Sequence, residues 1–293
     1  MTLPSATLDT LPSAPLGRSG FTRLVRRHPL VVVGGGLLTL LILVALAAPF
    51  YAGDPTNMDP FKRLQPPSST MWFGSDNLGR DVFARTIFGA RVSLMVGLMS
   101  ASCAAVAGLL IGILAGYIRA FDNVMMRVMD GLMSIPTILL AIALISLTGP
   151  GFGILIVAIA IPETPAVARL VRSVVLSVRE RPYVEAALCG GARLPKVLWR
   201  HILPSTIPAL MVQSATVCAS AIMTEAGLSF LGVGVPPEIP SWGNMISSSR
   251  LFLSIAPMTI FAPGICLAVT VLAVNLLGDG LRDMFDPRAK RRR

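Results

Sequence analysis

Residues 29–50 read PLVVVGGGLLTLLILVALAAPF, and no charged side chain interrupts them. An α-helix rises about 1.5 Å per residue, so Leu30–Phe50 is long enough to cross a hydrocarbon core of roughly 30 Å. A cleaved signal peptide is the competing interpretation, because residues 45–47 (ALA) resemble a cleavage site. The run is too long for the apolar core of a signal peptide, and further runs follow it, so we predict a first transmembrane helix at 30–50.

Five more apolar runs follow, and each is long enough to span a bilayer. The chain of 293 residues is 54% hydrophobic and only 14% charged, whereas a soluble protein carries roughly a quarter of charged residues. We therefore predict an all-α integral membrane protein with six transmembrane helices. The remaining five helices are expected at 92–117, 124–147, 151–172, 204–230 and 255–279.

The distribution of basic residues predicts the orientation of these helices. Of the 25 lysines and arginines, 19 lie in the segments that share one side of the membrane with the N-terminus. Because basic residues accumulate on the cytoplasmic side, both termini are expected in the cytoplasm. The net charge of +10 does not point to nucleic acid, since the basic residues cluster at the ends of apolar runs rather than on a soluble face.

The connecting segments divide the chain further. We expect a cytoplasmic tail at 1–29, an extracytoplasmic loop at 51–91 and a core domain at 92–282. Within the core, a second outside segment lies at 228–254 and a polar loop at 179–203. The basic tail at 283–293 ends in four consecutive basic residues, which suit either the inner leaflet or plain solvent.

Several polar residues lie inside or beside the apolar runs. Arg127 and Asp130 are three residues apart near the inner end of the third run, so they are predicted to share a helix face and to pair. Pro136 follows and is expected to bend that helix, because proline removes a backbone hydrogen bond.

Glu163 lies in the fourth run between Pro162 and Pro165, and Glu225 lies near the outer end of the fifth. A carboxylate at membrane depth is costly unless it faces water or a partner. Glu163, Glu225 and Asp130 are therefore candidates for lining a translocation path. The alternative for both glutamates is a structural carboxylate bonded to a neighbouring helix.

Three glycines of the second run, Gly108, Gly112 and Gly116, are spaced four residues apart. Small residues at this spacing allow two helix backbones to approach closely. The pattern predicts a helix–helix contact and by itself indicates no function.

Signals of catalysis and metal binding are missing from the sequence. The four cysteines and two histidines share no ligand spacing, and neither HExxH nor GxSxG occurs. No GxxxxGK[ST] occurs either, so the chain is not expected to bind ATP. We predict no catalytic residue, no metal ligand and no cofactor bound by this chain.

Residues 185–204, EAALCGGARLPKVLWRHILP, are too polar to span the membrane. They predict two short helices separated by Gly190-Gly191, a pair that permits a sharp turn. The second helix carries an apolar stripe at Leu194, Val197, Leu198 and Ile202. Such a hairpin fits a groove in another protein, or it lies on the lipid surface; the residues alone leave both possibilities open.

This stretch resembles the EAA loop of ABC importer permeases. Residues 72–94, 224–245 and 275–287 resemble segments of the dipeptide/oligopeptide/nickel permeases, specifically the C-type subunit of the pair. The resemblance covers roughly residues 70–288. Glu163, Gly190 and Gly227 depart from the family pattern, and the departures at Glu163 and Gly227 bear on the substrate rather than on the fold.

The resemblance implies a type I ABC importer permease fold in a bacterial inner membrane. It implies a second homologous permease, two ATPase subunits that bind ATP and Mg²⁺, and an extracytoplasmic substrate-binding protein. The cargo would be a peptide, with nickel or glutathione as alternatives; a channel and an intramembrane enzyme are the other classes considered. Contact with the ATPase is implied for Glu185, Ala186, Ala187, Gly191, Leu194, Val197 and Leu198.

Overall fold

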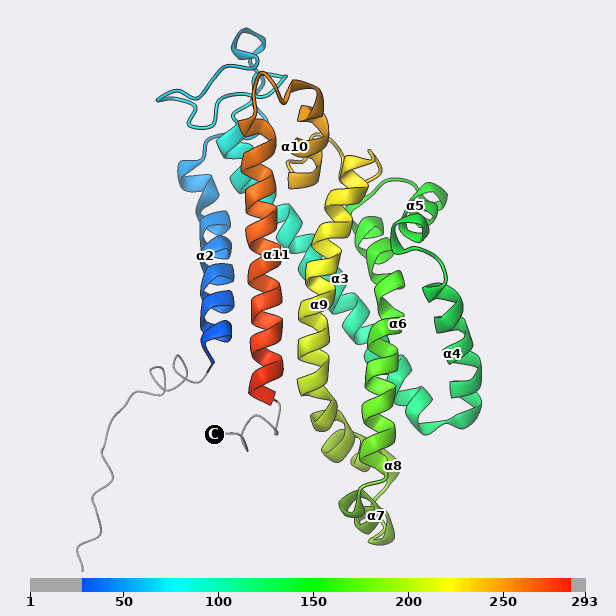
Figure 1. Cartoon of the computed structure of the whole chain (residues 1–293). Helices are drawn as coiled ribbons and strands as arrows, with labels where there is room; N and C mark the ends of the chain where they lie inside the picture. The colour runs from blue at the N-terminus through cyan, green and yellow to red at the C-terminus, as the bar shows by residue number, and fades with distance from the viewer. Residues whose placement is uncertain (1–27, 286–293) are drawn as a thin grey trace, which may run out of the picture.

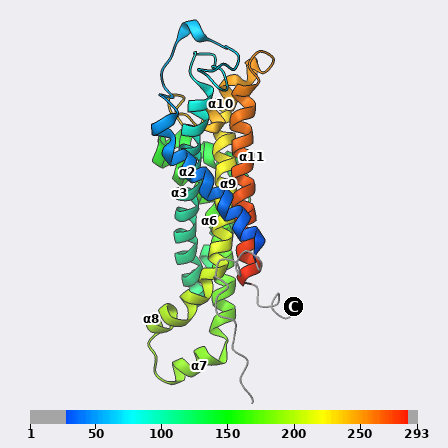
Figure 2. The same cartoon turned by 90° about the vertical axis from the view of Figure 1, so that its left-hand side faces the viewer.

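The computed structural model describes residues 28–285, and every regular element in that part of the chain is helical. Five helices form a bundle, which α3 (Val82–Tyr117) crosses obliquely (Figure 1), and each is long and apolar enough to cross a membrane. They are α2 (Pro29–Tyr51), α3 (Val82–Tyr117), α6 (Phe152–Arg179), α9 (Leu203–Phe230) and α11 (Met258–Phe285). Figure 2 shows α2 lying obliquely across the bundle.

The third predicted span is broken. Helix α4 (Arg119–Met133) and helix α5 (Thr137–Thr148) meet at 96°. The two helices are long and apolar enough for a membrane span only when they are joined as one bent segment. Pro136 lies at the break, so the predicted bend is confirmed. The span count is therefore five, or six with the bent pair.

Two helices begin or lie where the sequence suggested loops. Helix α3 starts at Val82 rather than at residue 92, because the Asp81 side chain caps it by accepting the Phe83 N–H at 2.9 Å. Helix α10 (Trp242–Ser249) lies within the segment 228–254 and is capped by Ser241. Together with η1 (Pro60–Lys62) and η3 (Arg250–Phe252), these elements order much of the chain between the spans.

The bundle has two distinct ends, which Figure 1 shows at top and bottom. The loop end carries residues 52–81, residues 231–257 and α10. The hairpin end carries α7 (Pro182–Cys189), α8 (Leu194–Val197) and a π-helical turn at Leu198–Ile202. Helix α2 begins, and α11 finishes, on the side of the hairpin end, so both ends of the described chain lie there.

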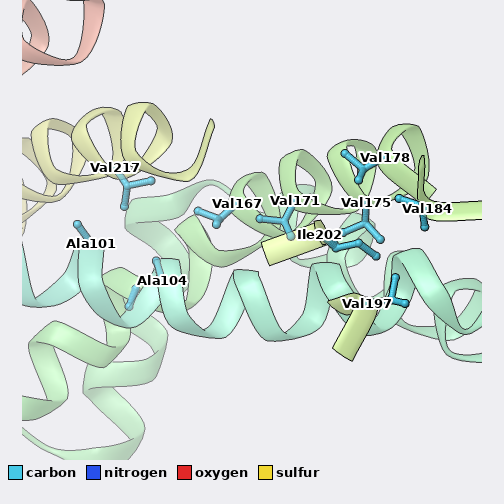
Figure 3. Packing of buried hydrophobic residues seen from close by; sticks show 11 residues of the cluster. Ala101, Ala104, Val167, Val171, Val175, Val178, Val184, Val197, Ile202 and Val217 are labelled. Atoms are coloured by element: carbon cyan, nitrogen blue, oxygen red, sulfur yellow. The ribbon is translucent and has the colours of Figure 1, made fainter. Parts of the chain in front are cut away.

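The most extensive contact between two helices joins α3 and α6. A Cβ built on Gly108, Gly112 or Gly116 would lie 2.5–2.7 Å from the Cβ of an α6 valine, so only glycine fits at this distance. The opposing side chains belong to one buried cluster and lie between the two helices (Figure 3): Val167, Val171 and Val175.

Candidate functional site

The helix of the hairpin that comes first, α7, begins and ends at residues that commonly mark helix ends. Pro182 occupies the first turn of α7, where its missing N–H costs nothing. Gly190 follows the last residue of α7, and Gly191 has a φ of +80°, a conformation that favours glycine. The Ala192 N–H then donates to the Ala187 carbonyl at 3.0 Å, which closes the turn. These two short helices therefore leave the bundle and return to it at a fixed angle.

Three apolar side chains anchor the hairpin to the bundle. Val184, Val197 and Ile202 are fully buried and join the cluster that also holds α6 valines (Figure 3). Val197 is therefore an anchor of the hairpin and cannot contact another protein in this structure, although the resemblance implied such a contact. Of the predicted apolar stripe, Val197 and Ile202 attach the hairpin to its own chain, whereas Leu194 is exposed.

A different set of side chains faces outward from the hairpin. Trp199 is 76% exposed, and Leu188 and Leu194 are each 44% exposed. Glu185, Ala186 and Gly191 are exposed, while Ala187 and Leu198 are half-buried. Sequence reasoning missed Trp199, although a tryptophan beside Arg200 and away from the apolar stripe was a visible signal. We call the exposed set Tyr183, Glu185, Ala186, Leu188, Leu194 and Trp199 the outer hairpin face.

The π-helical turn joins the hairpin to α9. Pro204 has no N–H, so it cannot donate to the Arg200 carbonyl as an α-helix would require. The turn widens at Leu198–Ile202, immediately before this proline. The Tyr183 and His201 rings, with centroids 5.9 Å apart, connect α7 to the same turn.

Asp130 pairs with a different arginine from the one predicted. Its carboxylate accepts a hydrogen bond from Arg169 of α6 at 2.5 Å, and Asp122 accepts one from Arg172 at 2.5 Å. These two pairs hold α4 against α6, which the local spacing of Arg127 and Asp130 did not reveal. Side chains of the Asp130 pair are 62% and 45% exposed, so we assign this pair little stability.

Glu163 lies on the contact between α6 and α9. Its Oε1 accepts a hydrogen bond from the Ser220 hydroxyl at 2.6 Å, and its side chain is half-buried. The structure thus gives this carboxylate a bond to a neighbouring helix and also leaves part of it accessible. Its place on the translocation path stays a prediction.

Glu225 has a different environment. It is fully buried, and its two oxygens accept hydrogen bonds from Ser93 of α3 at 3.2 Å and from Ser229 at 2.8 Å. A carboxylate enclosed within its own chain and bonded to a neighbouring helix fits the structural role better than the role in lining a path.

The loop end contains further buried polar contacts that the sequence did not indicate. Trp242 is fully buried, and its indole N–H donates to the Thr86 carbonyl at 3.0 Å. Asp76 accepts a hydrogen bond from the Arg80 Nε at 2.7 Å and lies 3.8 Å from the Arg85 Nε. The tryptophan in the polar stretch 240–245 was the available signal. These contacts fasten the loop to the start of α3.

Residues 28–285 contain no group of three or more histidine, cysteine or acidic side chains placed to hold a metal ion.

Comparison with known proteins identifies the family. Residues 108–291 match the family described as binding-protein-dependent transport system inner membrane component. Residues 20–67 match the N-terminal transmembrane domain of oligopeptide transport permease C. The first match covers more than half of the chain.

Individual relatives agree with this assignment. A probable peptide ABC transporter permease protein, y4tQ of Sinorhizobium fredii, is 84% identical over 271 residues, which are 92% of this chain and 93% of the relative. The dipeptide transport system permease protein DppC of Alkalihalophilus pseudofirmus is 40% identical and covers 93% of this chain and 90% of its own length. The glutathione transport system permease protein GsiD of Pectobacterium atrosepticum is also 40% identical, covering 93% and 91%.

A solved structure shows the same fold. A chain of the inward-facing MetNI methionine ABC transporter matches 69% of this chain and 97% of its own length, with a TM-score of 0.56 and 20% identity. At this identity the likeness concerns the fold alone. The chain is a multi-pass inner-membrane permease with the fold of an ABC importer subunit, and it belongs to the family of binding-protein-dependent transport system inner membrane components.

Proposed function

We propose that this chain is one permease subunit of an ATP-driven importer for peptides. The observation that carries the proposal is the hairpin α7–α8, which projects beyond the bundle and presents apolar side chains to the outside (Figures 1 and 2). An exposed apolar surface of this kind is typical of a contact with another protein. The names of the relatives, which include peptide and dipeptide permeases, support the cargo.

The hydrolysis of ATP that drives transport would take place on other subunits. The sequence has no phosphate-binding loop, so two ATPase subunits would bind ATP and Mg²⁺ and receive the outer hairpin face in a groove. Coupling requires that the hairpin contact the open and closed ATPase states differently, because equal contacts would shift no equilibrium. The resemblance in 185–191 supports Glu185, Ala186, Ala187 and Gly191 as contacts.

The translocation path would be shared with a second homologous permease. In this arrangement the accessible side of Glu163 faces the path, and the loop end faces the extracytoplasmic binding protein. The excess of basic residues on the hairpin side supports this orientation, since the hairpin would then lie in the cytoplasm.

Glutathione is the second candidate cargo, because one relative of equal identity to the dipeptide permease is a glutathione permease. The binding protein that works with this chain would decide between the two. Measured affinities of that binding protein for dipeptides and for glutathione therefore discriminate them.

The test is a gentle detergent extraction of the tagged chain from native membranes, with mass identification of the proteins that copurify. Two ATPase subunits and a second permease are expected. Recovery of the chain alone, or only with itself, would overturn the proposal and favour a channel. A variant with Leu188 and Trp199 replaced by serine serves as the matched control, and it should lose the ATPase subunits but keep the second permease.

A further inference from the structure

Glu163 lies deep within the membrane-spanning part of α6. It is about 16 Å along the helix axis from Phe152 and about 24 Å from Arg179, at 1.5 Å per residue. Pro162 and Pro165 flank it inside the helix. A charged group at such a depth is tolerated where it meets water or a partner group rather than hydrocarbon.

The contacts of Glu163 leave its charge unbalanced. Among residues 28–285 its carboxylate has one hydrogen bond, from Ser220, and no ion pair. The carboxylates of Asp122 and Asp130, by contrast, each pair with an α6 arginine. One oxygen of Glu163 is held at a fixed position, and the other is left for a further donor.

Glu225 shows how this chain builds a structural carboxylate. Both of its oxygens receive a serine hydroxyl, and the residue is fully buried. Glu163 receives one hydroxyl and remains half-buried. Both carboxylate oxygens of Glu225 therefore have a hydrogen-bond donor, whereas only one oxygen of Glu163 has one. Glu163 is also the more accessible of the two residues.

The surface beside Glu163 is polar as well. On α9, Gln213, Thr216 and Ser220 follow one another at spacings of four or three residues, so they share one helix face. Thr216 is exposed and the other two are half-buried, whereas Val217, Ala221 and Ile222 point into the bundle. A polar face of this kind does not suit lipid. We call Glu163, Gln213, Thr216 and Ser220 the polar face.

We infer that the polar face is a transit site for the positively charged group of the cargo, with Glu163 as the acceptor. The inference rests on the proposed function, because it takes this face to line the path. The ligand chemistry is a primary ammonium or a guanidinium, which a carboxylate with one free oxygen accepts through a charge-assisted hydrogen bond. A peptide supplies an ammonium at its N-terminus or on a lysine side chain, and an arginine supplies a guanidinium.

A single carboxylate with one free oxygen would bind the charged group of the cargo only weakly, which suits a site that the cargo passes through. A site on a transport path must bind well enough to admit its ligand and weakly enough to release it. Ser220 fixes the direction of the carboxylate but leaves its charge in place. Selectivity for cationic cargo would thus arise in the membrane, in addition to any selectivity of the binding protein.

The test replaces Thr216 by cysteine and uses the reaction of this cysteine with charged reagents to measure the electrostatic potential at the polar face. The complete importer is prepared with Cys103, Cys189, Cys218 and Cys266 replaced by serine, and Thr216→Cys is reacted with a cationic and an anionic methanethiosulfonate of similar size. The measured quantity is the ratio of the two reaction rates. We expect Glu163→Gln to lower the cation-to-anion ratio about threefold or more, because one unit charge is removed nearby.

Two further variants make the result specific. Glu238→Gln removes the same charge from an exposed position of the loop end and should leave the ratio unchanged. Ser220→Ala removes the hydrogen bond but keeps the Glu163 charge, so the ratio should stay high even if transport falls. This variant separates the effect of the Glu163 charge from that of its hydrogen bond.

The outcomes separate the inference from the function beneath it. A cysteine at 216 that is inert to both reagents in every nucleotide state would overturn both the placement on a path and the transit site. If the cysteine reacts but its cation-to-anion rate ratio is the same with and without Glu163→Gln, the transit site alone would be overturned. Failure of the wild-type importer to take up any peptide would overturn the peptide proposal, whereas a charge-dependent ratio would still support a site for cations.

Uptake then identifies the source of the positive charge. The ratio of Glu163→Gln to wild-type uptake is compared for a neutral peptide, its N-acetyl form and a lysine-containing form. A drop of about tenfold confined to free N-termini assigns the site to the peptide ammonium. A drop confined to the lysine form assigns it to basic side chains, and equal uptake of all three peptides by both proteins contradicts the inference.

Discussion

The two ends of the molecule differ in which large side chains they bury. At the loop end and in the helical turns next to it, the side chains of Glu225, Trp242 and Arg85 are 0–2% exposed and find partners within the chain. At the hairpin end, Trp199 is 76% exposed, and it extends outward from a structure held by a few valines. The loop end thus encloses large polar groups within a single subunit, although it also exposes Phe61 and Leu251, whereas the hairpin end exposes its tryptophan.

This difference teaches where mutations should act. Changes at the loop end should alter stability, because they remove contacts that are present in the isolated chain. Apart from Tyr183, whose ring lies beside that of His201, changes on the outer hairpin face should alter transport and leave stability intact, because those side chains are exposed. Each prediction below tests one side of this contrast.

The largest effect is expected at the hairpin end. Glu185→Lys reverses the charge of an exposed side chain in the proposed ATPase contact, and mismatched charge at an interface costs several kcal/mol. Uptake by the complete importer should fall by more than tenfold, while the apparent Tm in detergent stays unchanged. Asp283→Lys makes the same reversal at an exposed position outside the hairpin and should transport normally. Normal uptake by a well-expressed Glu185→Lys importer would contradict the docking role.

The loop end should respond in stability instead. Glu225→Ala deprives two serine hydroxyls of their acceptor and leaves a cavity, at a cost of roughly 2–4 kcal/mol. The apparent Tm of the importer should fall by several degrees, and Glu225→Gln, which retains an acceptor, should fall less. An exposed carboxylate changed in the same way, Glu238→Ala, is the control. Equal Tm values for Glu225→Ala and Glu238→Ala would contradict the structural role.

A smaller effect is expected midway between the ends. Gly112→Ala would place a Cβ 2.7 Å from the backbone oxygen of Ala168, which forces α3 and α6 apart and costs about 1–3 kcal/mol. Gly36→Ala in α2 meets nothing within 4 Å and should be neutral or slightly stabilising. Thermal unfolding of the two variants in the same detergent compares them. Equal stability would mean that the tight contact between α3 and α6 can be relaxed without cost.

The smallest effect concerns pH at the loop end. Burial raises the pKa of the Asp81 carboxyl above its ordinary value, even though the Phe83 N–H bonded to it acts in the opposite direction. A raised pKa means that the folded state holds the proton more tightly, so this group stabilises below its ordinary pKa of 3.8 and loses that contribution as pH rises. Asp81→Asn should remove this dependence while preserving the cap.

The expected gain of Asp81→Asn at neutral pH is about 0.5 kcal/mol or less. The measurement is the difference in Tm between variant and wild type at pH 4 and at pH 7, and that difference should increase with pH. A difference that shrinks as pH rises would contradict the sign of the shift.

The amino-acid sequence predicted the spans well because hydropathy reports directly on contact with lipid. It placed α2 within one residue at each end, since both ends coincide with a change in polarity. It began α3 ten residues late, because Arg85 and Thr86 lower the hydropathy of the first turns without ending the helix. Asp81 was the local signal of the true start.

The candidate site was less predictable because its contacts join distant positions. Glu225 and Ser93 are 132 residues apart, and Asp130 and Arg169 are 39 apart, so local spacing gives no information on either pair. The predicted stripe of the hairpin contained Val197 and Ile202, which are buried in the structure. Periodicity alone does not say whether Val197 faces its own bundle or a partner. Only the packed chain distinguishes the two.

The continuous helical segment Leu194–Phe230 has a mechanical meaning. It spans 37 residues, or about 55 Å, and it joins the hairpin through the π-helical turn to Ser220 and then to Glu225. Because the segment is helical throughout, a displacement of the hairpin would be transmitted along it, although the π-helical turn and Pro208 interrupt its hydrogen bonding. Ser220 belongs to this segment and Glu163 to α6, so a slide of the segment past α6 by one helical turn, about 5.4 Å, would carry the two groups beyond the reach of a hydrogen bond. Movement of the hairpin and release of the Glu163 carboxylate would then be a single event.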